Sequence, residues 1–471
     1  METSARRAAT SPLKNGHSAK ILVETPGSKG VSTRCPRVFQ RAATPPIRLS
    51  KGEFNRRLVR AAVCQSAPIS RVELGELTGL PLSALTNLCG ELIASSYLRE
   101  RTAAAPGENG LGRRRTLLEP DLESLGVAAV QYDRHSVDAA IVDLSGAVRW
   151  QNSYHGPFTD AARLSKGIVA AITDALDASP IKHKRLLAVG AADPGLVDRA
   201  RGRTLRAANV PGWRNIAIGE MLRDVANLPV IVDRGDGFQA LGEAAFGAGR
   251  GARSLLYVSL AREGIGGGVV ENGRLVAGRD GAAGEIGHVN IGGDLPCGCG
   301  LKGCLEAHVN RARMTGQFRE SLQSGAPAIG SRAAKETRQR KTTGCRGVFR
   351  CRIQYARPNS FAQLIKAAAA GDRAGRRIVA DAARIVARAA GSAINLLNPE
   401  CVVFGGYFAE AGQFFLEPLM EALPEFVIPE MARDLSLKLA ALGETSAFAG
   451  VAAQVRAETF AYPVTGQEIA S

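Results

Sequence analysis

A histidine and three cysteines lie within seventeen residues of this chain, and glycines separate the cysteines. The four residues are His288, Cys297, Cys299 and Cys304. One imidazole and three thiolates make up the ligand set of a closed, four-coordinate zinc site. Because side chains would fill all four positions, no position is left for a catalytic water, and the predicted zinc is structural. The segment is therefore expected to fold as tight loops around one ion.

The alternative is a group of buried or disulfide-bonded cysteines. The other six cysteines lie elsewhere and show no spacing pattern. The N-terminus has charged and polar residues where a secretory signal needs an apolar stretch, and no run approaches about eighteen apolar residues. Disulfides belong mainly to exported proteins. We therefore favour zinc, and we expect a cytoplasmic protein.

The net charge of +16 is concentrated in two segments. Residues 1–119 carry +10 and residues 330–357 carry +8, which leaves −2 for the rest of the chain. A basic front end suits a polyanion such as nucleic acid, because counterion release drives such binding. Residues 1–50 lack periodicity and are interpreted as a disordered basic leader. Residues 330–357 are interpreted as an unstructured basic insertion. A second nucleic-acid contact and a sequencing frameshift are the two less favoured alternatives.

Three short helices are predicted between residues 53 and 93, forming a helix-turn-helix. The first covers Glu53–Gln65. The second begins at a capping box of Ser70 and Glu73 and ends at Thr78, and the third follows Leu80-Pro81. Their spacing places these apolar residues inside: Phe54, Leu58, Ala61, Ala62, Cys64, Leu82, Leu85, Leu88, Leu92 and Ile93. It places these residues outside: Arg56, Arg57, Arg60, Ser83, Ala84, Thr86 and Asn87.

The last helix would present its N-terminal residues to the major groove of double-stranded operator DNA. The segment Gly110–Glu119 is predicted to be a hairpin wing with an arginine tip, completing a winged domain over residues 51–119. A small helical subdomain without DNA is the alternative, and the basic wing favours DNA. The predicted DNA contacts are Arg71, Ser83, Ala84, Thr86, Asn87, Arg113, Arg114 and Arg115.

Beyond residue 120, short β-rich runs alternate with helical segments, which predicts an α/β fold. The predicted strands are Gly126–Gln131, Asp138–Asp143, Leu186–Gly190, Val230–Val232, Leu255–Val258 and Cys401–Phe404. The predicted helices are Ala161–Ala178, Asn310–Gln323, Ser360–Leu397 and Ala411–Leu423.

Several motifs in order resemble the ROK family (repressors, open reading frames and kinases), in its transcription-regulator branch, over about residues 52–460. The most specific is Gly281-Ala-Ala-Gly-Glu-Ile-Gly-His288 followed by the cysteine segment that ends at Glu306. Weaker elements are Ala192–Asp198, Asn209–Trp213, Ala240–Glu243, Gly264–Gly268 and Asn398–Glu400.

The resemblance implies a two-lobed, sugar-kinase, hexokinase and actin-like (ribonuclease H-like) domain over residues 120–460, followed by a tail at 461–471. Lobe one would cover about 120–240 and lobe two about 241–445, with a cleft between them. His288 and the three cysteines would hold zinc. Glu285, His288, Glu306 and Asn209 would face a sugar. Carboxylates accept hydrogen bonds from hydroxyls, and an imidazole fixed by metal is a rigid partner.

The chain departs from the family's kinases at three places. The kinases carry Asn-Asp where this chain has Arg234-Gly235, so the base toward the sugar hydroxyl is missing, unless Asp236 replaces it. The phosphate loop is replaced by Gln131–His135, which has no glycine, and a Gly-Thr-Gly segment by Ala261-Arg-Glu-Gly264. Phosphoryl transfer depends on positioning and charge stabilisation, so neither kinase activity nor ATP binding is expected.

Three functions remain open. The favoured one, which follows the resemblance, is a transcriptional regulator of bacterial type, most simply a repressor associated with the nucleoid, whose operator affinity responds to a sugar or sugar derivative. A homodimer or a dimer of dimers is expected, since a helix-turn-helix usually reads two half-sites. The alternatives are an active sugar kinase with a DNA-binding appendage, and a constitutive DNA-binding or scaffold protein with a degenerate cleft.

Overall fold

The computed structural model describes residues 49–102, 116–207, 210–262, 264–323, 361–462 and 469–470. Several parts of the sequence lie outside these ranges, so the expectations for them stay predictions: residues 1–48 of the predicted leader, the 330–357 insertion, Arg113, Arg114, Arg115, Asn209 and Glu263. Leu49 and Ser50, the last two residues of the predicted leader, form strand β1. In the described ranges, no single helix is long and apolar enough to cross a membrane. The two helices Arg71–Thr78 and Leu82–Ala94 reach that length and apolar composition only when they are taken together, and a sharp bend separates them.

The described front of the chain contains three helices, in the place of the predicted helix-turn-helix. Helix α1 spans Lys51–Ser66, α2 spans Arg71–Thr78 and α3 spans Leu82–Ala94, as the periodicity predicts. The capping box at Ser70 and Glu73 is present, and Gly79 ends α2 with a φ of 69°. Helices α2 and α3 meet at 111°, within the usual range for a helix-turn-helix.

Of the predicted wing segment Gly110–Glu119, the described part is Thr116–Glu119, which lies in a strand. Strand β3 (Leu98–Thr102) pairs antiparallel with β4 (Thr116–Pro120), which also pairs with β2 (Ile69–Ser70). The arginine tip falls outside the described residues. The core of this unit is formed by these side chains: Val59, Ala62, Val63, Ile69, Leu74, Leu85, Cys89, Leu92, Leu98 and Leu118.

Two predicted orientations in this unit are wrong. Leu82 was expected inside, but it is 54% exposed, because it occupies the first position of α3, beyond the reach of the core. Arg60 was expected outside, but its guanidinium packs over the Tyr97 ring, 4.7 Å from the centroid. Periodicity alone could not foresee that an aromatic ring would cover a cation.

The next lobe is built on a five-stranded sheet with the order β12-β8-β5-β6-β7. The three strands β5, β6 and β7 run antiparallel, and β8 and β12 join β5 in parallel. Helices α4 (Ala161–Asp177) and α5 (Ile218–Ala226) cover one face. The strands are β5 Gly126–Tyr132, β6 Ser136–Asp143, β7 Val148–His155, β8 Leu186–Asp193 and β12 Val230–Arg234. A small sheet adds β9 Leu196–Asp198, β10 Arg203–Arg206 and β11 Arg214–Ile216, and η1 is His183–Arg185.

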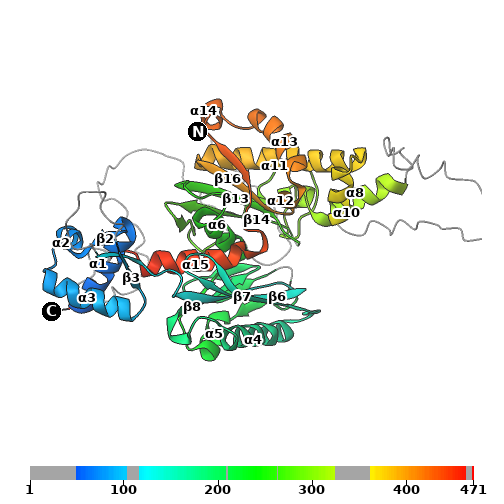
Figure 1. Cartoon of the computed structure of the whole chain (residues 1–471). Helices are drawn as coiled ribbons and strands as arrows, with labels where there is room; N and C mark the ends of the chain where they lie inside the picture. Colours follow the sequence, from blue (N-terminus) through cyan, green and yellow to red (C-terminus); the bar gives the residue numbers. More distant parts are fainter. Residues whose placement is uncertain are drawn as a thin grey trace, which may run out of the picture. The chain divides into compact units, whose positions relative to one another are not determined.

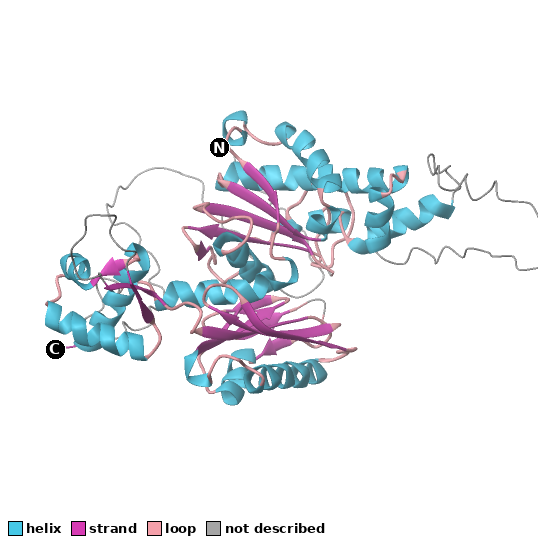
Figure 2. Cartoon of the chain, viewed as in Figure 1, coloured by secondary structure: helices cyan, strands magenta, loops and turns pink. Residues whose placement is uncertain are grey.

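The second lobe repeats this strand order as β15-β14-β13-β16-β17. Its helices pack on the sheet face turned away from the first lobe (Figure 2). The strands are β13 Ser254–Leu260, β14 Ile265–Glu271, β15 Arg274–Leu275, β16 Cys401–Gly406 and β17 Ser436–Leu439. The helices are η2 Ile286–His288, α7 Leu305–His308, α8 Arg311–Gln323, α10 Phe361–Ala369, α11 Arg373–Leu397, α12 Tyr407–Ala411, α13 Gln413–Ala422, η3 Leu423–Glu425, α14 Pro429–Ala432 and η4 Gly443–Thr445.

One predicted helix is two. The segment Ser360–Leu397 was expected to be continuous, but it breaks after Ala369. Gly371 has a φ of 93°, and the Asp372 carboxylate caps α11 by accepting a hydrogen bond from the Gly375 N–H at 2.7 Å. In the sequence, an aspartate followed by basic residues resembles the exposed face of one continuous helix. The role of this aspartate as an N-cap is therefore not apparent from the sequence.

Two helices lie between the two sheets (Figure 1). Helix α6 (Gly235–Ala245) and helix α15 (Ser446–Thr459) pack against each other and share one apolar core with strands of both sheets. The Glu243 side chain of α6 is fully buried and accepts hydrogen bonds from the N–H groups of Ala248, Ala441 and Leu442 at 2.8, 3.1 and 2.9 Å. This carboxylate therefore fixes α6 to the segment that leads into α15.

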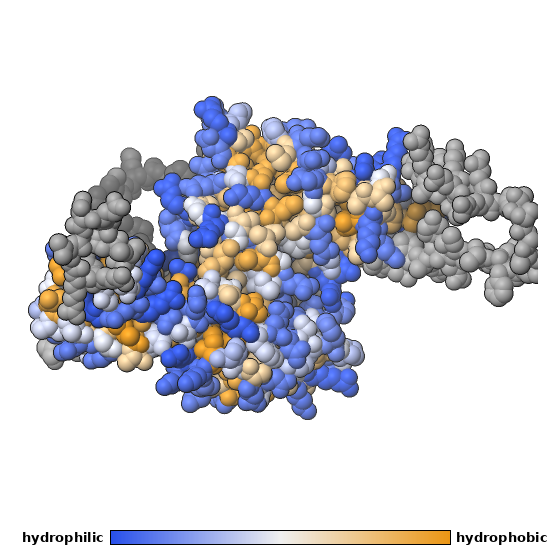
Figure 3. All heavy atoms as spheres, in the orientation of Figure 1, coloured by the Kyte–Doolittle hydropathy of each residue, from blue (hydrophilic) through white to orange (hydrophobic). Residues whose placement is uncertain are grey.

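The two lobes together give the predicted sugar-kinase-like architecture. The face drawn in Figure 3 is mainly hydrophilic, with apolar areas over the second lobe.

The short strand β1 (Leu49–Ser50) pairs in parallel with β18 (Ile469–Ala470).

Candidate functional site

The predicted metal ligands come together. The ligand atoms of His288, Cys297, Cys299 and Cys304 all lie within 4.8 Å of one another. The Cys297 Sγ is 3.6 Å from His288 Nδ1, and the Cys299 Sγ is 3.8 Å from the Cys304 Sγ. Ligand atoms around a tetrahedral zinc with ordinary bond lengths lie roughly 3.3–3.8 Å apart. The donor set and its spacing therefore fit a metal ion.

Short loops and close backbone contacts produce this geometry. Isolated β-bridges join Asn290 to Cys304 and Pro296 to Lys302, so the cysteine segment folds back on itself. Gly303 has a φ of 72°, and a Cβ at that position would lie 2.8 Å from the Gly292 carbonyl. Gly287 lies so close to the Ile265 carbonyl that a Cβ there would clash. A residue with a Cβ would clash with the backbone at either position, which explains why both residues of the motif are glycine.

His288 connects the cluster to a cleft. Its Nδ1 is directed at Cys297, while its Nε2 lies 3.9 Å from a carboxylate oxygen of Glu285. The cleft encloses about 630 Å³ and is lined by Glu285, His288, Glu306 and Asp236, among others. Three of the predicted sugar-facing residues thus share one cavity, and the fourth, Asn209, lies outside the described residues.

Glu306 is oriented by the second lobe. Its Oε2 accepts a hydrogen bond from the Ile265 N–H at 3.0 Å, and burial raises its pKa. A Cβ at Gly264 would collide with this carboxylate, so the glycine makes room for it. The other carboxylate oxygen lies 4.0 Å from the Cys297 Sγ. Glu306 is therefore held between the metal cluster and the cleft.

The sequence did not reveal the partner of Glu285. The Arg234 guanidinium, 4% exposed, donates to Glu285 Oε1 at 2.5 Å and to the Gly267 carbonyl at 3.3 Å. It also donates to the Ala283 carbonyl. Arg234 and Glu285 are 51 residues apart, so no local pattern could pair them. The signal available in the sequence was a cation in a motif position otherwise occupied by asparagine.

Asp236, the residue after Gly235, is partly buried and fixed by its neighbours. Gly235 begins α6, and the neighbouring Asp236 is held by a hydrogen bond from the Ser259 hydroxyl at 3.0 Å. Burial raises the pKa of Asp236, and Gly266 leaves no room between this carboxyl and β14. A carboxyl fixed in this way is poorly placed to swing toward a substrate hydroxyl.

The phosphate-loop position is also closed. Strand β5 ends at Tyr132, and Asp133 Oδ1 accepts hydrogen bonds from the N–H groups of His135 and Ser136 at 2.6 and 2.8 Å. The amides that could cradle a phosphate are thus already bound to a carboxylate of the same turn.

A buried carboxyl organises the cleft wall of the first lobe. Asp193 accepts hydrogen bonds from the Tyr132 hydroxyl at 2.7 Å, the Gly195 N–H at 2.7 Å and the Trp213 indole at 3.1 Å. The Thr204 hydroxyl donates as well. Burial raises the pKa of Asp193 against these stabilising bonds. The network ties the motif at 192–198 to the motif that ends at Trp213, so both are explained as parts of one wall.

The predicted DNA-reading face is solvent-accessible where it is described. Ser83, Thr86 and Asn87 are exposed on α3 and Ala84 is partly exposed. The Thr86 hydroxyl donates to the Leu82 carbonyl at 2.8 Å, which leaves its methyl group outward. The Arg71 guanidinium donates to Glu100 of β3 at 2.7 Å, and its predicted contact with DNA stays a prediction.

These motifs and their geometry agree with a family profile. The ROK family profile matches residues 127–458. The chain belongs to the ROK family. Among curated ROK relatives, a glucokinase of Halalkalibacterium halodurans is 32% identical over 289 residues, covering 60% of this chain and 81% of the relative. A xylose repressor of Caldicellulosiruptor bescii is 25% identical over 413 residues, covering 87% of this chain and 97% of the relative. NagC of Escherichia coli, a DNA-binding transcriptional dual regulator, is 26% identical over 413 residues, covering 86% and 93%.

Solved ROK structures have the same fold. A ROK family transcriptional regulator described as a homologue of the E. coli MLC protein gives a TM-score of 0.70 at 23% identity, over 87% of this chain and 97% of that one. A ROK hexokinase from Thermus thermophilus gives 0.54 at 26% identity, over 70% and 97%.

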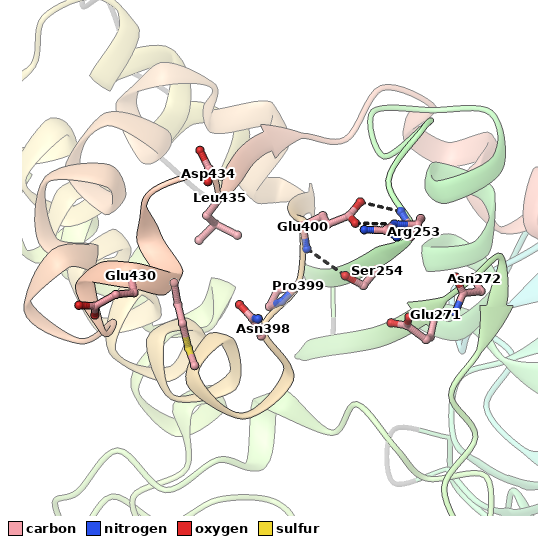
Figure 4. Close-up of a pocket in the computed structure, with 11 residues that line it drawn as sticks. Arg253, Ser254, Glu271, Asn272, Asn398, Pro399, Glu400, Glu430, Asp434 and Leu435 are labelled. Carbon is pink, nitrogen blue, oxygen red and sulfur yellow. Dashed lines mark hydrogen bonds and ion pairs between the residues drawn. The ribbon is translucent and has the colours of Figure 1, made fainter.

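A second cavity of about 580 Å³ lies at the start of β13 and β16, and it contains none of the predicted site residues (Figure 4). Arg253 donates to Glu400 at 2.9 Å, which lowers the pKa of that carboxyl, and Glu400 N–H donates to the Ser254 hydroxyl. Asn398 ends α11 with a φ of 44°. The ROK motif Asn398-Pro-Glu400 therefore has a structural role in the turn from α11 to β16.

Proposed function

We propose that this ROK protein is a transcriptional repressor whose binding to operator DNA is modulated by a sugar or sugar derivative. One observation carries the proposal. Similarity to the repressors runs over 413 residues, 86–87% of this chain, whereas similarity to the glucokinase covers 289 residues, 60% of it. The exposed α3 and the wing strands supply what DNA binding requires.

The ligand side of the proposal rests on the cleft. His288, Cys297, Cys299 and Cys304 would hold a structural zinc, which stiffens the loop that carries Glu285 and Glu306. Glu285, His288, Glu306 and Asn209 would face the effector. A ligand that favours one arrangement of the lobes would then change the affinity for operator DNA. Operator DNA would change the affinity for the ligand by the same factor.

Operator binding would use a homodimer or a dimer of dimers. A helix-turn-helix dimer reads half-sites about one helical turn, roughly 34 Å, apart. The reading contacts would come from Ser83, Ala84, Thr86 and Asn87. Arg71, Arg113, Arg114 and Arg115 would add contacts to the DNA, with the three wing arginines on phosphates.

Operator binding can be tested by selecting bound fragments from the source genome and measuring affinity by fluorescence anisotropy. Ser83→Ala with Asn87→Ala is expected to lower specific affinity about 5- to 150-fold for each base contact that is lost, since a base contact contributes about 1–3 kcal/mol. Replacing the three wing arginines with alanine should weaken binding to all sequences and flatten its salt dependence. Lys182→Ala, an exposed cation of the ROK domain, is the matched control. Equal losses of the helix variant on specific and random DNA would contradict base reading.

The alternative function is sugar phosphorylation, favoured by the 32% identity with a glucokinase. The geometry at Gly235, Asp236 and Asp133 leads us to expect no ADP release with glucose, xylose or N-acetylglucosamine above a protein-free control. Turnover that disappeared in Asp236→Ala would contradict this expectation and assign Asp236 as the base. Asp138→Ala, on the same cleft but away from the base position, would control for general disturbance.

A further inference from the structure

Leu82 is a leucine that the core of the front unit does not use. It is the first residue of α3 and is 54% exposed, whereas Leu85, Cys89 and Leu92 of the same helix are buried. Helix α3 is the second helix of the predicted helix-turn-helix, and the N-terminal residues of that helix face the base edges in such a fold. Leu82 therefore lies where bases would be read, although it is not among the predicted DNA contacts.

Thr86 extends the apolar surface of Leu82 by one helical turn. Residues four apart lie one above the other on a helix. The Thr86 hydroxyl donates to the Leu82 carbonyl at 2.8 Å, so its hydrogen is used within the helix and its methyl group is directed outward. Thr86 is exposed, and with Leu82 it forms a row of two apolar groups. Ser83 and Asn87, which are also four apart and exposed, form a polar row beside it.

The composition of α3 limits which bases this face can distinguish. Guanine is read most often by Arg or Lys, cytosine by Asp or Glu, adenine by Asn or Gln, and the methyl group of thymine by apolar side chains. The helix Leu82–Ala94 contains no Arg, Lys or Asp. Its one glutamate, Glu91, lies in the last turn and pairs with Arg56 at 3.4 Å. The face therefore suits A·T pairs, with Asn87 toward adenine and the apolar row toward thymine.

We infer that Leu82 is a specificity-determining residue that recognises thymine in the operator half-site by contact with the C5-methyl group, and that Thr86 makes a second such contact. The inference rests on the proposed operator binding and names the chemistry that α3 recognises. DNA is the occupant that the surroundings favour, because residues 1–119 carry +10 and the polar side chains of Ser83 and Asn87 lie beside the leucine.

The experiment removes thymine methyl groups one at a time. The full chain would select duplexes from a randomised library, and the selected operator would be synthesised with single thymines replaced by uracil, which lacks only the C5-methyl group. We expect at least one replacement in each half-site to weaken binding about fourfold, the equivalent of one buried carbon group. Fluorescence anisotropy at a fixed salt concentration would measure the affinities.

Two variants assign the methyl contacts to residues. In Leu82→Ala, one of the uracil replacements should no longer weaken binding, because the side chain that contacts this methyl group is absent. In Thr86→Ser, which keeps the hydroxyl and removes the methyl group, a replacement at a neighbouring thymine should lose its effect. Leu77→Ala removes a leucine of α2 that is 60% exposed, and as the matched control it should keep every uracil effect. Thermal midpoints would show that all three variants are folded.

The outcomes separate this inference from the proposed function. Sequence-specific binding without any uracil effect, or uracil effects that persist in both Leu82→Ala and Thr86→Ser, would overturn the inference and leave operator binding standing. Selected half-sites made of G·C pairs alone would do the same. A full chain that selects no sequence from the library would count against operator binding itself, and Leu82 would then be an ordinary exposed leucine.

Discussion

Cys304→Ala is expected to release the metal and to lower the stability of the ROK domain by several kcal/mol. Cys304 is fully buried, and its Sγ lies 3.8 Å from that of Cys299, at the centre of the loops that carry Glu285 and Glu306. Structural zinc contributes folding free energy directly, about 10–16 kcal/mol in small zinc peptides. Here the second lobe has its own apolar core, so a smaller loss, on the order of 5 kcal/mol, is expected.

Metal content per chain by mass spectrometry and thermal unfolding with and without a chelator would measure the effect. The wild type should carry one zinc per chain and lose stability with the chelator. Cys64→Ala removes a half-buried cysteine of α1 and should keep the zinc. A Cys304→Ala protein that retained both the metal and the wild-type midpoint would show that the cluster is a group of ordinary cysteines.

Glu243→Ala is expected to destabilise the protein by about 3 kcal/mol or more. The substitution removes the acceptor of three backbone N–H groups, those of Ala248, Ala441 and Leu442. Each N–H left without a partner in a buried place costs about 1–3 kcal/mol, and the segment before α15 would lose its attachment to α6. Glu243→Gln keeps one oxygen acceptor and should lose less.

Urea unfolding followed by circular dichroism would give the change in free energy. Glu444→Ala, an exposed carboxylate next to the same segment, is the control. A loss below 1 kcal/mol for Glu243→Ala would mean that water replaces the carboxylate and that the buried hydrogen bonds contribute little.

Features set by neighbours in sequence could be predicted. The capping box fixed the start of α2, and the spacing of His288 and the cysteines was enough to bring four ligand atoms together. The glycines within the motif indicated where the loops turn tightly. These elements depend on short-range sterics and hydrogen bonds, which local spacing encodes.

Features that depend on distant partners could not be predicted. The Arg234–Glu285 pair, the four donors around Asp193 and the buried attachment of Glu243 all join segments far apart in the chain. Leu82 and Arg60 were misplaced for the same reason, since the tertiary environment at a helix end, or an aromatic ring beside it, decides exposure. Helical periodicity predicts which face of a helix is apolar, but it does not predict which residues of other elements pack against that helix.

The self-capped turn at Asp133 bears on how phosphoryl transfer could be engineered into this chain. A Cβ at Gly235 would meet only the Asp193 carbonyl, at 3.7 Å, so the backbone there leaves room for the first carbon of a side chain. The amides of His135 and Ser136 would still be bound to Asp133. We therefore expect that a chain engineered for phosphoryl transfer needs changes in two places, the start of α6 and the turn after β5. A substitution in either place alone is expected to give no ADP release.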